Sequence, residues 1–149
     1  MTHRRLAIAV GVLGSMLLAP TALAGPPTVT TITIDVNLET GEEMFTTGGG
    51  VLCAAGIAET DGFVAGGGRQ DKGAFSFHII KTLTCDDDSG SFQIKVEAAT
   101  VADGTRGGFA IVNGSGTGDY VGLQGAGSLI GEFTDVGILD HYVGRLSIG

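Results

Sequence analysis

The chain of 149 residues carries 16 acidic and 8 basic side chains, which gives it a formal net charge of −8 at pH 7. Nucleic acid is therefore disfavoured as a partner, because affinity for phosphate depends on clustered lysines and arginines. Glycine is frequent, at 27 residues, but the glycines separate segments rich in Val, Ile, Phe and Thr, a composition that excludes a disordered chain.

Residues 1–24 have the three parts of a cleavable secretory signal. A short basic start precedes an apolar, helix-compatible stretch over residues 6–19, and small residues follow it. Ala22 and Ala24 fit the pockets of a signal peptidase, so cleavage is expected between Ala24 and Gly25. The alternative is a retained membrane anchor, but the apolar stretch is about 14 residues long, short of the roughly 20 needed to span a bilayer. Removal of the signal is therefore favoured, and no stable membrane insertion is expected after cleavage.

Cleavage would leave residues 25–149 as one secreted, extracellular domain, exported by a bacterial type of signal. The paired Arg4 and Arg5 leave a twin-arginine route open. Their removal makes the mature chain more acidic, with six basic residues (8 − 2) against 16 acidic ones. Cys53 and Cys85 are the only cysteines. In an exported protein such a pair predicts a structural disulfide, because a redox site usually has C-x-x-C spacing and a zinc site needs more ligands.

The first half of the mature chain contains a series of alternating segments. Residues 28–38 alternate between apolar and polar side chains and predict a strand. Residues 42–53 predict a second extended segment, with a bend at its triple glycine. A short strand at 54–58 is expected to end in a hairpin turn at Asp61-Gly62, because Asp-Gly is a strong hairpin signal. Residues 63–68 predict a further strand.

Five more segments follow in the rest of the chain. After a polar loop at 69–72, residues 73–84 predict a long strand, and 86–90 predict a turn. Residues 92–98 show the clearest alternation in the chain. Strands are also expected at residues 106–113, 128–134 and 137–148. No mature segment has a helical period, so the sequence predicts an all-β domain of about eight strands, an antiparallel barrel or, alternatively, a β-sandwich.

The glycine-rich segment 114–127 is the most distinctive stretch. It is not a phosphate-binding loop, because the chain has no Gly-Lys pair and no helix is predicted after the segment. Its pattern G-T-G-x-Y-x-G-L-x-G-x-G, at residues 116–127, resembles the allene oxide cyclase and dirigent-like barrel superfamily. The resemblance implies an eight-stranded antiparallel barrel. In plant members of that superfamily, the barrel guides cyclisation or coupling of a reactive intermediate. No active-site motif matches, so no catalytic residue is carried over.

Candidate pocket residues are few and scattered. The two mature histidines lie on predicted strand faces opposite the larger apolar residues, which favours surface or barrel-mouth positions. With Asp140 or Glu97 nearby they would supply a base or two metal ligands. The acidic run 86–88 lacks calcium-binding spacing and is interpreted as a solvated turn. The candidates for lining a pocket are His78, Tyr120, His141, Tyr142 and Arg145, and Tyr120 is expected to cover a barrel end.

These observations favour a secreted, non-enzymatic barrel that binds a small apolar ligand or a partner, with no metal and no cofactor. The first alternative is an enzyme similar to the dirigent proteins or allene oxide cyclase, an isomerase, for which polar residues would have to converge inside the barrel. The second is a structural or oligomeric extracellular component, which leaves a homo-oligomer open. The residues themselves do not choose between enzyme and binding protein.

Overall fold

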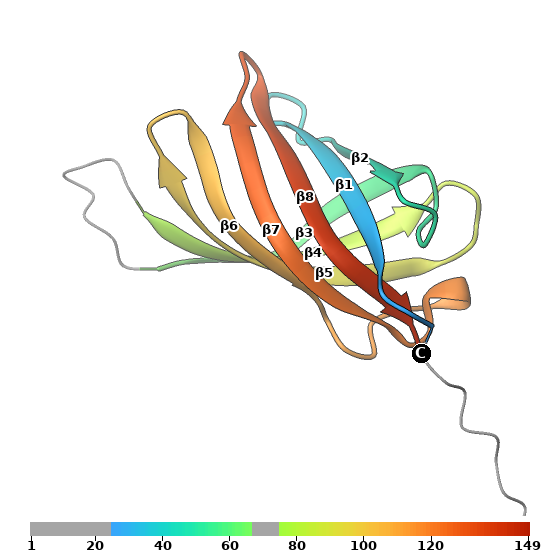
Figure 1. Cartoon of the computed structure of the whole chain (residues 1–149). Helices are drawn as coiled ribbons and strands as arrows, with labels where there is room; N and C mark the ends of the chain where they lie inside the picture. Colours follow the sequence, from blue (N-terminus) through green and yellow to red (C-terminus); the bar gives the residue numbers. More distant parts are fainter. Residues whose placement is uncertain (1–24, 67–74) are drawn as a thin grey trace, which may run out of the picture.

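A computed structural model describes residues 25–66 and 75–149 (Figure 1). Eight antiparallel strands follow one another around a closed barrel, and the last strand pairs with the first. The predicted barrel is confirmed and the sandwich alternative is not observed. Residues 1–24 and the predicted loop 69–72 lie outside the described residues. The strands are β1 (Thr28–Asn37), β2 (Glu43–Gly48), β3 (Ala55–Ala65), β4 (Ser76–Cys85), β5 (Ser91–Val101), β6 (Gly104–Ile111), β7 (Leu123–Phe133) and β8 (Gly137–Ile148).

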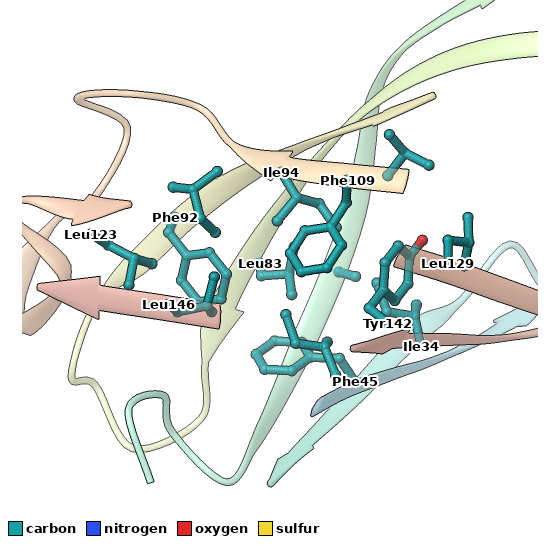
Figure 2. Packing of buried hydrophobic residues seen from close by; sticks show 14 of the residues in the cluster. Ile34, Phe45, Leu83, Phe92, Ile94, Phe109, Leu123, Leu129, Tyr142 and Leu146 are labelled. Atoms are coloured by element: carbon teal, nitrogen blue, oxygen red, sulfur yellow. The ribbon is translucent and has the colours of Figure 1, made fainter. Parts of the chain in front are cut away.

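Alternation along the strands determines which side chains enter the barrel. In β5, Phe92, Ile94 and Val96 are buried, while Lys95 and Glu97 are exposed on the outer wall. Side chains from opposite walls meet at the barrel axis (Figure 2). An eight-stranded barrel is just wide enough to be filled in this way. Among the described residues, no helix is long and apolar enough to span a bilayer.

The sequence prediction around Asp61-Gly62 was wrong. These residues do not form a hairpin turn. They lie inside one continuous strand, β3, in place of the two predicted strands. The pairing with β4 shifts by one residue between Thr60 and Gly62, which is a β-bulge. The hairpin chemistry of Asp-Gly is local, and the longer pairing with β4 overrides it.

One end of the barrel is closed by the disulfide and the glycine-rich segment. The predicted bond between Cys53 and Cys85 is confirmed and joins the loop after β2 to the end of β4. The 3-10 helix η2 (Gly118–Tyr120) buries Tyr120 beside this bond. The backbone N–H of Cys53 donates to Tyr120 Oη at 2.9 Å, and the Tyr120 ring packs edge-on against Phe92.

The glycines of the segment allow its tight path across the end of the barrel. Gly118 and Gly122 adopt positive φ angles of 56° and 81° on either side of η2. A Cβ atom on Gly118 would lie 2.2 Å from the carbonyl oxygen of Ser89. The close approach of the segment to the β4–β5 turn therefore requires glycine. The following strand, β7, begins at Leu123, five residues earlier than the predicted 128.

The opposite end of the barrel is open on one side. β2 pairs with β3 through only three residues, Met44 to Thr46. Beyond them β3 continues past the start of β2, and the Glu59–Ala65 stretch pairs with β4 alone within the part of the chain that the structure describes. Every residue of that stretch is exposed. The gap between Glu43, where β2 starts, and this half of β3 is here called the notch.

Candidate functional site

Six polar side chains gather inside the open end of the barrel, and they are here called the polar cluster. Four of them are buried, with Lys81 3%, Thr105 2%, Asp140 8% and Tyr142 1% exposed. Thr60 is exposed at the notch, and the Glu43 side chain is 13% exposed. The cluster therefore extends from the notch into the core. Its members are Glu43, Thr60, Lys81, Thr105, Asp140 and Tyr142.

The half of the cluster at the notch is a closed triangle of hydrogen bonds. Lys81 Nζ donates to Glu43 Oε2 and, at 2.9 Å, to Thr60 Oγ1. Thr60 Oγ1 donates to Glu43 Oε1 at 2.7 Å. Burial of an ion pair removes hydration from both charges, so a pair of apolar side chains would often be equally stable. Stability alone therefore does not account for an ion pair at this position.

The inner half of the cluster is arranged around Asp140. Its Oδ1 accepts a hydrogen bond from Thr105 Oγ1, and its Oδ2 accepts one from Tyr142 Oη, each at 3.3 Å. Gly131 lies between Thr105 and Asp140 in the register of β6, β7 and β8. A Cβ atom on Gly131 would lie 2.1 Å from Thr105 Oγ1 and 2.3 Å from Asp140 Oδ1. The glycine therefore provides the space in which the two side chains meet.

The two halves are coupled electrostatically. Burial raises the pKa of Asp140, and the Glu43 carboxylate raises it further, against the lowering effects of Lys81 and of the hydrogen bonds from Tyr142 and Thr105. Burial, followed by the nearby Asp140, raises the pKa of Tyr142 well above its usual value. One ammonium thus lies near two carboxylates, and Asp140 can hold a proton at a higher pH than an exposed aspartate.

An aromatic surface continues from the polar cluster along the inward face of the β3–β4 hairpin. We call it the aromatic platform, and it consists of Phe63, Phe75 and Phe77. The rings of Phe63 and Phe77 stack with centroids 6.1 Å apart, and Phe75 lies 5.9 Å from Phe77. Phe63 is 56% exposed. Residues two apart in a strand share a face, so Phe77 follows Lys81 on the same side of β4.

The candidates from sequence do not come together. His78 lies on the outer wall, where its Nδ1 is 3.7 Å from Glu97 Oε1 and both side chains are about half exposed. His141 Nδ1 is 3.3 Å from Thr33 Oγ1 between β8 and β1, and Arg145 is exposed on β8. A base or metal pair made of the two histidines is therefore not formed.

The two tyrosines are both buried but lie in different parts of the barrel. Tyr120 is at the closed end, beside the disulfide, and Tyr142 belongs to the polar cluster. Asp87, in the acidic turn, accepts hydrogen bonds from the side chain and backbone of Ser89, which lower its pKa. Asp87 also lies near both cysteine sulfurs. The disulfide leaves no thiolate there to bind a metal.

Sequence reasoning missed Glu43, Thr60, Lys81 and Thr105. Lys81 did carry a signal, because it occupies the inward register between Ile79 and Leu83. A lysine at a core position of a strand requires a partner. Glu43 carried no such signal, since it stands at the first position of β2.

Two of the depressions in the described outer surface lie away from the polar cluster. The larger, of about 290 Å³, lies over β5, β6 and β7 and is lined by Lys95, Glu97 and the side-chain-free Gly108, among others. The smaller, of about 150 Å³, is lined by Val64, His78 and Ile80 and their neighbours on the outer side of the β3–β4 hairpin. Neither contains a member of the polar cluster.

Comparison with known families gives one match, and it assigns no activity. A family model described as "Protein of unknown function (DUF3224)" matches residues 49–135. This range includes Thr60, Lys81 and Thr105 of the polar cluster, together with the aromatic platform. No curated protein and no solved structure matches the chain.

Proposed function

The chain belongs to the DUF3224 family of proteins of unknown function, and from its own geometry we propose that it binds a small, largely apolar molecule with one polar group at the open end of the barrel. The observation that carries the proposal is the continuity of two surfaces on the inward face of β3 and β4. The polar cluster reaches solvent at Thr60, and the aromatic platform follows it with Phe63 exposed. Binding sites combine apolar walls with a few polar groups in this way.

The two surfaces would have different tasks in binding. The platform would bury the apolar body of the ligand, because burial of aromatic surface is the larger source of affinity. Lys81, Glu43 and Thr60 would orient its polar group, because donors and acceptors at the notch are held in place by one another. A site of this kind needs no catalytic step, and the proposed activity is binding alone.

The proposed setting is outside the cell. The buried disulfide fits an oxidising compartment. Together with the signal predicted at residues 1–24, it supports export of the protein. A small extracellular binding protein would then meet its ligand at the notch, which opens to solvent.

The test is calorimetric titration of the purified protein with decanol, decylamine and decanoate, which share an apolar body and differ in the head group. At least one should bind, with a dissociation constant on the order of 10 µM. Phe63→Ala should weaken the binding of each compound that binds by about tenfold, because it removes a large apolar contact. Lys81→Met should instead change the order of affinity among the three compounds.

The matched control is Val143→Ala, which removes an apolar side chain that is 49% exposed on the outer wall of β8. It should leave the affinity for each compound that binds unchanged. Absence of binding by every member of the series would overturn the proposal. So would equal affinities for the protein and its Phe63→Ala variant.

A second candidate function is an enzyme that guides cyclisation or isomerisation, as the resemblance implies. The observation in its favour is Asp140, a buried carboxyl with a raised pKa that accepts hydrogen bonds from Tyr142 and Thr105. Such a group can donate or accept a proton at a higher pH than an exposed aspartate. If a bound compound is converted, Asp140→Asn should abolish turnover while leaving binding intact. Retained turnover in that variant would exclude the role.

A further inference from the structure

The Glu59–Ala65 half of β3 has one backbone edge without a partner in the described chain. The N–H of Gly66 donates to the carbonyl of Ser76, which makes 66 and 76 a hydrogen-bonded pair. Antiparallel pairs alternate, so Val64–His78 and Gly62–Ile80 are also hydrogen-bonded pairs. The N–H and C=O groups of Phe63 and Ala65 therefore point away from β4, into the notch where β2 has ended.

This edge lacks most of the devices that protect exposed strands. Phe63 and Val64 are apolar and 56% and 65% exposed. The bulge ends at Gly62 and leaves the next residues regular. Asp61, the nearest acid, accepts hydrogen bonds from Thr82 and Gln93 of β4 and β5, so it is directed away from the edge. An apolar, regular free edge is a template for another strand.

We propose that two copies of this chain pair through the β3 edge, antiparallel about a two-fold axis at Val64. Phe63 and Ala65 are two residues apart, so this axis places Phe63 of each copy opposite Ala65 of the other. Each of these pairs exchanges both backbone hydrogen bonds, which gives four N–H···O=C bonds. The sheet of one barrel would then continue into the hairpin of the next.

The side chains favour this register and favour a second copy of the chain as the partner strand. It places a large ring opposite a small methyl group on the inward face, twice over, and Val64 opposite Val64 on the outer face. Such cross-strand apolar pairs stabilise antiparallel sheets. Residues 62–66 contain no charge, so no acid lies opposite an acid, which matters in a chain with a net charge of −8.

The interface is a single pair of strands and is smaller than a standard protein interface. We therefore expect a reversible dimer with a dissociation constant of about 10 µM to 1 mM. Its formation should strengthen with added salt, because screening reduces the repulsion between two acidic chains. The hydrogen bonds of the dimer come from backbone groups of the hairpin, but Phe63 belongs to both the dimer contact and the aromatic platform. Dimer formation and ligand binding are therefore expected to influence each other.

The first experiment is sedimentation equilibrium of the purified protein and two variants at Ala65. Ala65→Pro removes an N–H that points to the free edge and leaves the pairing with β4 intact, a position at which an edge strand tolerates proline. It should weaken the dimer at least tenfold, with an unchanged circular dichroism spectrum. Ala65→Ser keeps the N–H and should still dimerise.

The second experiment locates the contact. A Val64→Cys variant should form a disulfide-linked dimer under mild oxidation, because residues facing each other in a non-hydrogen-bonded pair have Cα atoms about 4.5 Å apart. Val143→Cys, which replaces a side chain that is also exposed but lies on β8, should not cross-link. Ala65→Pro should suppress the cross-link. A protein that stays monomeric up to about 1 mM, or a dimer insensitive to Ala65→Pro, would overturn the proposal.

Discussion

Thr105 Oγ1 lies 3.3 Å from Asp140 Oδ1, across the inward face of β7 at the position of Gly131. Both side chains are buried, so the hydrogen bond lies in the barrel interior. It exists because the residue between them has no side chain, since a Cβ atom there would come within 2.3 Å of both oxygens. The inner half of the polar cluster thus depends on a glycine that takes no part in its hydrogen bonds.

Gly131→Ala should therefore destabilise the protein. The new methyl group would separate Thr105 from Asp140 or displace both, and overpacking together with a weakened buried hydrogen bond costs about 2–4 kcal/mol. Urea unfolding measures the loss. The matched control is Gly62→Ala, because a Cβ atom there has no neighbour within 4 Å. Equal stabilities of the two variants would show that the space at Gly131 is not needed.

The ion pair of Lys81 and Glu43 leads to a prediction about single and double variants. Lys81→Met removes one charge and leaves Glu43, 13% exposed, with Thr60 as its remaining hydrogen-bond donor. Breaking a buried pair in this way costs about 3 kcal/mol. The double variant Lys81→Met/Glu43→Leu lacks both charges. Most of the stability lost in the single variant should therefore be recovered. A double variant less stable than the single one would contradict this account.

Tyr120 gives a prediction for the closed end of the barrel. Tyr120→Phe removes the oxygen that accepts the Cys53 backbone N–H at 2.9 Å. A buried donor left without a partner costs about 1–3 kcal/mol. Ser89→Ala removes a hydroxyl that also contacts Tyr120 Oη, at 2.9 Å. This contact lies nearer to solvent, so its loss should lower the stability by less. Thermal unfolding of the oxidised proteins compares the two, and a larger loss in Ser89→Ala would refute the assignment.

Most of the fold could be predicted from sequence because alternation is a local property. The strict pattern of β5 and the turn after Cys85 required no tertiary information. The bulge in β3 did require it, because Asp61-Gly62 has the chemistry of a hairpin turn and of a bulge alike. Only the length of the pairing with β4 distinguishes the two outcomes.

The polar cluster was harder to predict because its members meet across the barrel. Lys81 and its partner Glu43 are 38 residues apart. Their contact depends on the register of β3, which lies between β2 and β4 and pairs with both. Asp140 and Tyr142 could be assigned to one face of the last strand by alternation. That this face points into the barrel, toward Thr105 and Lys81, follows only from the closure of the sheet.

The raised pKa of Asp140 predicts how stability changes with pH. Burial is its main cause, so ionisation of Asp140 is harder in the folded protein than in the unfolded chain. Below the ordinary value of 3.8 the carboxyl is protonated in both states, and the stability that its protonated form contributes is fully present. As the pH rises from there through the raised pKa of the folded state, that contribution is lost.

Asp140→Asn should remove this pH dependence, because asparagine stays neutral and still offers an oxygen to Thr105. The variant should be close to the natural protein in stability at about pH 3 and should gain relative to it as the pH rises to about 7. Urea unfolding of both proteins across this range measures the difference. A difference that stays constant with pH would mean that Asp140 ionises as easily in the barrel as in water, and the cluster would then offer no poised proton to a bound molecule.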